Sequence, residues 1–149
     1  MRRLVLGIAV LLIGVGVGLA IALTKSPSGP PPVATLPELR ERQVIRLDDH
    51  RGFLVYNGGN PLAMSDDAQH LGGGDRVVFC RSSEMFESPA HGEKFDLAGR
   101  YYGEPARRGL DQYRLWVDDG GVFVDFGDVI PGPERGEPPG GEPSGPFCY

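Results

Sequence analysis

The stretch that decides the fold of this chain begins at Ala68-Gln69-His70-Leu71-Gly72 and resumes at Ser88-Pro89-Ala90-His91-Gly92-Glu93-Lys94-Phe95-Asp96, closing on Leu97-Ala98-Gly99. Each half places a glycine shortly after a histidine, and glycine adopts a positive φ without strain. We therefore expect Gly72 and Gly92 to lie in turns.

The segments on either side of this stretch have the pattern of short antiparallel strands. From residue 43 onward apolar residues alternate with polar ones, and turn residues interrupt the alternation every few positions. Asn57-Gly58-Gly59-Asn60 is a strong hairpin signal. No segment of this part has helical periodicity over more than two turns, so we expect an all-β class, built as small antiparallel sheets or a sandwich. Strands are expected at 44–47, 52–56, 61–64, 76–79, 113–117 and 122–126.

The N-terminal segment has the features of a membrane anchor. Residues 4–23 carry no charge, lie between Arg2-Arg3 and Lys25, and span about 30 Å of hydrocarbon as a helix. Arg2 and Arg3 favour a cytoplasmic N-terminus at 1–3, which would put the rest of the chain outside the cytoplasm, at a single-pass cell membrane. A signal peptide cleaved after Ala22 is the alternative.

Two proline-rich segments flank the expected β domain, which we assign to residues 43–130. Residues 24–42 form a neck in which Ser26–Pro32 should be an extended spacer and Pro37–Arg42 a short helical turn. Residues 131–149 have almost no apolar side chains before Phe147, so a disordered tail is expected there.

Charge and cysteine content restrict the possible partners. The net charge is −5 and the 15 basic residues are scattered along the chain, which makes nucleic acid an unsuitable partner. Cys80 and Cys148 are the two cysteines. Because Cys148 lies in the expected disordered tail, we expect two free or buried thiols, with one bridge between them as the alternative.

The ordered set of motifs resembles a Rieske iron–sulfur domain. In that family a Cys-x-His-Leu-Gly loop and a Cys-x-x-His-Gly loop hold one two-iron cluster, with two imidazoles on one iron and two thiolates on the other. His70-Leu71-Gly72 and His91-Gly92 match these loops, and a family-like Phe-Asp-x-x-Gly run follows at 95–99. The resemblance implies a Rieske-like fold whose tip would carry His70 and His91 close together.

The same resemblance shows that the sulfur ligands are missing. The two thiolate positions are occupied by Ala68 and Ser88. Alanine has no donor atom, and a serine hydroxyl is a poor substitute for a soft thiolate. Rescue of a cluster by Cys80 and Cys148 would require the tail to fold into the site. We therefore expect degenerate cluster-ligand positions, no catalytic residues and no bound cofactor, with a 2Fe-2S cluster as the alternative.

Four possibilities remain open on these grounds, the last of which is a free-standing anchored domain that belongs to no complex. The first is a membrane-anchored, extracytoplasmic accessory subunit of a respiratory or photosynthetic membrane complex, with its histidines serving as structural residues. The second is an electron-transfer protein with a working 2Fe-2S cluster. The third is a mononuclear metal-binding domain in which His70 and His91 are joined by nearby carboxylates. The candidate carboxylates are Asp66, Asp67, Glu87 and Glu93.

Overall fold

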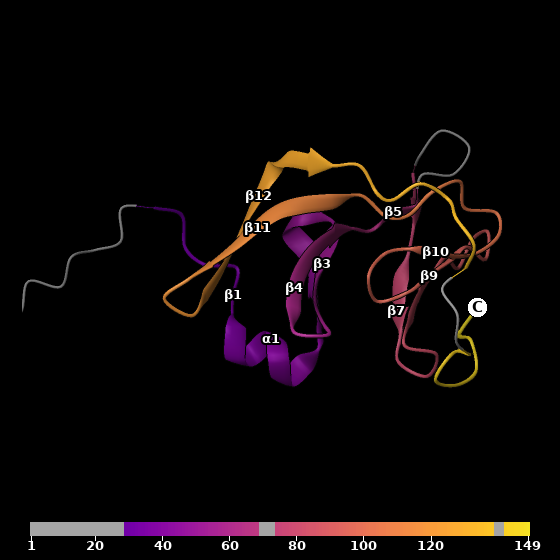
Figure 1. Cartoon of the computed structure of the whole chain (residues 1–149), viewed down its shortest axis with the longest axis horizontal. Coiled ribbons are helices and arrows are strands. Elements are labelled where there is room, and N and C mark those ends of the chain that lie inside the picture. The colour runs from indigo at the N-terminus through magenta and orange to yellow at the C-terminus, as the bar shows by residue number, and fades with distance from the viewer. Residues whose placement is uncertain (1–28, 69–73, 139–141) are drawn as a thin grey trace, which may run out of the picture. The chain divides into compact units, whose positions relative to one another are not determined.

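The computed structural model describes residues 29–68, 74–138 and 142–149. The chain divides into two units, Met1–Pro30 and Pro31–Tyr149, and every element below belongs to the second. Among the described residues, the regular elements are strands apart from one short helix and one 3-10 turn (Asp48–His50) (Figure 1). The all-β prediction is therefore confirmed. The elements are β1 (Ala34–Thr35), α1 (Leu36–Arg42), β2 (Val44–Leu47), β3 (Gly52–Asn57), β4 (Asn60–Ser65), β5 (Asp67–Ala68), β6 (Asp75–Arg76), β7 (Val78–Cys80), β8 (Met85–Glu87), β9 (Lys94–Phe95), β10 (Tyr101–Gly103), β11 (Gln112–Asp118) and β12 (Gly121–Ile130).

The strands form three antiparallel sheets. The largest has the order β1-β12-β11-β4-β3-β2, the second has the order β10-β9-β8-β7, and β5 pairs with β6 alone. Figure 1 shows β3, β4, β11 and β12 in one group, and β7, β9 and β10 in another. Five of the six predicted strands lie in the largest sheet, as expected from their alternation.

The predicted strand at 76–79 is wrong in one respect, because it is divided between β6 and β7, which belong to different sheets. Val77 separates them. Its side chain is fully buried and its backbone N–H donates to the carbonyl of Asp66 at 2.9 Å. The chain therefore crosses from one sheet to the next at Val77.

The side chains of β2 alternate between two hydrophobic cores. Val44 packs with Phe53 and Phe86 in a core that includes residues of all three sheets, whereas Ile45 packs with Leu39 of α1 on the other face of the largest sheet. Successive side chains of a strand point to opposite faces, so one edge strand contributes to both cores. The loops around residues 68 and 88 are carried by the first core, which contains Ala68 itself.

The predicted helical turn at Pro37–Arg42 is confirmed as α1. Thr35 is its N-cap and accepts a hydrogen bond from the backbone N–H of Glu38 at 3.3 Å, and a proline stands in the first turn. Arg42 forms an ion pair with Glu38 one turn earlier at 3.2 Å.

The predicted membrane helix at 4–23 lies outside the described residues. Within the described ranges, none of the helices has the length and apolar character needed to cross a bilayer.

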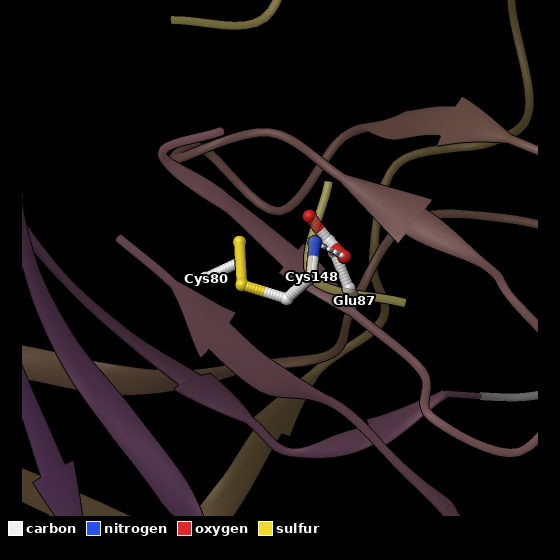
Figure 2. A group of neighbouring side chains, drawn as sticks. All are labelled: Cys80, Glu87 and Cys148. Atoms are coloured by element: carbon white, nitrogen blue, oxygen red, sulfur yellow. Dashed lines mark hydrogen bonds between the residues drawn. A yellow bond between two sulfur atoms is a disulfide. The ribbon is translucent and has the colours of Figure 1, made fainter. Parts of the chain in front are cut away.

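The C-terminal segment differs from the prediction. Cys80, at the end of β7, is joined to Cys148 by a disulfide, so the expectation of free thiols is wrong and the bridged alternative is right (Figure 2). The expected disorder also fails for residues 142–149. Ser144 donates its backbone N–H to Ser83 at 3.2 Å, and the Nζ atom of Lys94 lies 4.6 Å from the ring centroid of Phe147. Composition alone could not reveal a tail held by a covalent bond.

The buried carboxylate of Glu87 explains why the tail takes this path. One oxygen accepts from the Ser83 hydroxyl at 2.6 Å, and the other accepts from the backbone N–H groups of Cys148 and Tyr149, each at 2.9 Å. Figure 2 shows the Glu87 carboxylate beside the disulfide. A buried carboxylate must be hydrogen-bonded to offset its desolvation, and the tail supplies two of the three donors.

We predict that loss of the disulfide lowers the free energy of unfolding. The bridge closes a loop of sequence separation 68, for which chain entropy alone gives about 4 kcal/mol. A Cys80→Ser, Cys148→Ser variant should lose about 2–4 kcal/mol in urea unfolding followed by Trp116 fluorescence. Dithiothreitol should destabilise the wild-type chain equally and leave the double variant unchanged. An unfolding midpoint that does not respond to reductant would contradict the bridge.

Candidate functional site

The second loop, between β8 and β9, is closed around Ser88. The backbone N–H of Ser88 donates to the carbonyl of Glu93 at 2.9 Å, and the N–H of Gly92 returns to the carbonyl of Ser88 at 3.0 Å. Gly92 has φ +81°, which confirms the turn expected there. The backbone N–H of His91 donates to the Ser88 hydroxyl oxygen at 3.1 Å. Ser88 is fully buried, while the His91 side chain is half exposed.

The first loop connects β5 to β6. Ala68 is directly paired with Asp75 in this two-stranded sheet. The alanine side chain is fully buried in the first hydrophobic core. His70 lies outside the described residues, so the expected proximity of His70 and His91 stays a prediction. The backbone opposite Ala68 instead brings the carboxylate of Asp75 to the site.

Asp75 joins the two loops. Its Oδ2 atom accepts a hydrogen bond from the Ser88 hydroxyl at 2.5 Å and lies 2.9 Å from Nδ1 of His91. The Ser88 hydroxyl therefore donates to Asp75 of β6, while its oxygen accepts from the backbone of its own loop. Sequence reasoning missed Asp75, because its position depends on strand pairing with Ala68.

Two coupled carboxyl groups define the electrostatics of this site. Burial and the neighbouring Asp75 raise the pKa of Glu93 from 4.5 to about 7. Burial also disfavours the ionised form of Asp75, but hydrogen bonds involving Glu93, Ser88 and His91 outweigh it and lower the Asp75 pKa. Near neutral pH the pair therefore has one firmly ionised member, Asp75, and one that exchanges its proton.

The four carboxylates predicted as possible partners of His91 make different contacts in the structure. Asp66 is fully buried and faces arginines, with its Oδ2 atom 3.0 Å from a guanidinium nitrogen of Arg46. Asp67 accepts the backbone N–H of Gly74 at 3.1 Å, and Glu87 holds the C-terminal segment. Glu93 is the one predicted carboxylate that the structure brings to His91.

Asp75, His91 and Glu93 form a group with the chemistry of a metal site. One potential ligand atom from each lies within 4.8 Å of the other two. An imidazole with two carboxylates is a donor set that suits zinc and other divalent transition metals.

The residues present do not fit a two-iron cluster of the Rieske type. Ala68 offers no donor atom, and the Ser88 hydroxyl is engaged by Asp75 and by the backbone of His91. Both cysteine sulfurs are used in the disulfide. Cys80 is paired with Met85, three strand residues from the level of Ser88, or about 10 Å along the hairpin.

Comparisons with known proteins place the fold. A scan against protein-family models finds no match. The chain is 28% identical over 82 residues to the cytochrome b6-f complex iron-sulfur subunit of Chlorobaculum tepidum, covering 55% of this chain and 44% of that subunit. The chain thus spans less than half the length of this relative.

Two solved structures are also similar to this chain. The cyanobacterial plasma membrane Rieske protein PetC3 from Synechocystis PCC 6803 matches with a TM-score of 0.53 and 23% identity, over 64% of this chain and 99% of that one. The ferredoxin of carbazole 1,9a-dioxygenase from Nocardioides aromaticivorans matches with a TM-score of 0.45 and 26% identity, over 65% and 97% of the two chains.

We predict that Glu93 makes the stability of the domain fall as the pH rises. Between its ordinary pKa of 4.5 and the folded value of about 7, the folded chain holds a proton that the unfolded chain has released, so the free energy of unfolding decreases through this window. We would measure the free energy of unfolding in urea with a chelator present. Between pH 5 and pH 8 it should fall by about 1–3 kcal/mol more in the wild type than in Glu93→Gln.

The exposed Glu137→Gln variant is the control, and it should retain the wild-type pH dependence. Parallel pH profiles for wild type and Glu93→Gln would contradict the raised pKa.

Proposed function

From the premise that β2–β12 form a Rieske-type domain, we propose that this chain is an accessory subunit of a membrane electron-transfer complex and that it holds no iron–sulfur cluster. The relative that it matches is, by its name, a subunit of a cytochrome b6-f complex, which supports a respiratory or photosynthetic assembly. Its role there is structural, and the domain presents a shaped tip to another protein.

The proposal that no cluster is bound is supported mainly by the hydrogen-bond network around Asp75. A Rieske cluster needs two thiolates, one from each loop. Here the position on the first loop is an alanine within the hydrophobic core, and the position on the second is a serine whose hydroxyl binds Asp75. The carboxylate of Asp75 links the loops that a cluster would otherwise link.

The disulfide supports an extracytoplasmic location. Structural disulfides persist in oxidising compartments and are rare in the cytosol, and the Cys80–Cys148 bridge fixes the end of the chain to the domain. The uncharged segment 4–23, preceded by Arg2 and Arg3, is proposed as the membrane anchor, with its N-terminus in the cytoplasm.

Metal analysis of the full-length chain tests this proposal against the electron-transfer alternative. The chain is extracted from membranes under anaerobic conditions in mild detergent, and iron and acid-labile sulfide are measured per chain. We expect essentially none of either, because a two-iron cluster of this type needs two thiolates that the site lacks. The iron-sulfur subunit of Chlorobaculum tepidum, prepared in parallel, controls for cluster loss during handling.

Two irons and two sulfides per chain would establish the alternative, an electron-transfer protein. Native gel electrophoresis of the same extract tests the assembly, because an accessory subunit should co-migrate with integral membrane proteins. Migration as an isolated chain would refute the accessory role while leaving the metal result unaffected.

A second candidate function, mononuclear metal binding, is favoured by the convergence of Asp75, His91 and Glu93. His91 and Glu93 come from the prediction of a His70–His91 site, and Asp75 is added by the structure. On this candidate the three side chains would bind a divalent ion, with His70 as a proposed further ligand.

Zinc titration of the chelator-treated chain tests this candidate. Calorimetry should show one zinc per chain in wild type, and at least tenfold weaker binding in His91→Ala and Glu93→Gln variants because each loses one ligand. The exposed His50→Ala variant is the matched control. Equal zinc affinity in all four proteins would exclude the site.

A further inference from the structure

A cavity of about 450 Å³ lies beside β2 and β7, the edge strands of the two larger sheets. This is within the usual volume of small-molecule sites. Half of its lining side chains are arginines and half are apolar, and none of these lining residues is acidic. They are Arg42, Arg46, Arg76, Arg81, Val44, Phe53, Val78 and Phe79.

The arginines are only partly neutralised by the carboxylates around them. The buried carboxylate of Asp66 lies 3.0 Å from Arg46, 3.7 Å from Arg76 and 3.8 Å from Arg51, so one negative charge is shared by three guanidinium groups. Arg81 has no ion-pair partner in the part of the chain that the structure describes. An excess of positive charge therefore surrounds the cavity although the whole chain carries −5.

Two further ion pairs lower this excess of positive charge but do not cancel it. Arg42 pairs with Glu38, and Arg46 also contacts Asp48 at 2.9 Å. The side chain of Asp48 is 84% exposed and that of Glu38 is 44% exposed. Exposed pairs of this kind contribute little and are easily replaced by another anion.

The floor of the cavity is apolar and firmly held. Phe53 is 2% exposed and packs against Phe86 with ring centroids 4.8 Å apart, while Phe79 lies 5.5 Å from the same Phe86 ring. The guanidinium carbon of Arg46 lies 5.2 Å from the Phe53 ring centroid, an arrangement that orients its charge by a cation–π contact. Because Phe86 lies in the first core, the floor is pre-formed.

We propose that this cavity binds an organic anion, a phosphate or carboxylate attached to an apolar body. Guanidinium groups bind such anions through paired charge-assisted hydrogen bonds, and the phenylalanine and valine side chains provide a surface for the apolar part. A fully hydrated inorganic ion would leave that surface in water and gain less. Both a soluble metabolite and the headgroup region of an anionic lipid have this chemistry.

Nuclear magnetic resonance titration of the full-length chain in phosphatidylcholine nanodiscs tests the proposal. Phenyl phosphate is the probe, with inorganic phosphate and benzyl alcohol as the anion-only and ring-only comparators. We expect saturable shifts at the methyl groups of Val44 and Val78, and at least tenfold weaker binding of both comparators. Dihexanoyl phosphatidylglycerol, below its micellar concentration, represents the lipid source.

The variants are Arg81→Gln and the double variant Arg76→Gln, Arg81→Gln. The single change should weaken phenyl phosphate binding about three- to tenfold and the double change more than tenfold, because each removes a charge-assisted contact. Arg81 is exposed, so its replacement does not disturb the core. Arg107→Gln, another exposed arginine without an ion-pair partner among the described residues, is the matched control and should bind as wild type does.

Tighter binding of the phosphatidylglycerol than of phenyl phosphate assigns the site to lipid, and the reverse order assigns it to a soluble anion; both results support the site. Three results would overturn it: no saturable shift with either organic anion, equal affinity for phenyl phosphate and inorganic phosphate, or unchanged affinity in the double variant.

Discussion

The carboxylate of Asp75 is the group through which the two loops of this domain are joined. It stands opposite Ala68 on the first loop and binds the Ser88 hydroxyl and the His91 imidazole of the second. Hydrogen bonds to a charged group contribute about 1.5–3 kcal/mol each, and Asp75 is the acceptor for the proton of the buried Ser88 hydroxyl. The tip of the domain therefore has a polar connection made entirely by protein atoms.

The two cysteine sulfurs of the chain do not lie in these loops. Cys80 and Cys148 bind each other at the end of the β7–β8 hairpin away from Ser88, where they hold the C-terminal segment over the buried Glu87. The disulfide thus stabilises the fold. The two loop positions are occupied by alanine and serine instead of cysteine. The sheets of this domain are packed by two hydrophobic cores, and the first of these includes Ala68, the residue at one of the expected thiolate positions.

Most strands were predictable because short apolar segments between turn residues are a local signal, and the strands within residues 44–65 and 112–130 lie at or near the predicted ranges. Features that depend on distant pairing were not predictable. Asp75 reaches the site through its register with Ala68, Arg46 and Arg76 meet at one cavity from different sheets, and the tail is placed by a covalent bond to Cys80. Composition predicted disorder for that tail because it has little apolar surface, but a disulfide and hydrogen bonds to Glu87 replace that surface.

The domain combines a Rieske-type fold with two loops joined by the carboxylate of Asp75, and we propose that these loops carry no redox cluster. The most direct measurement is low-temperature electron paramagnetic resonance of dithionite-reduced membranes from cells with and without the chain, which needs no purification step. We predict that the two spectra are identical, so that the difference between them contains no signal. A rhombic signal of a reduced two-iron cluster that appears only with the chain, and disappears in a His91→Ala variant, would contradict it.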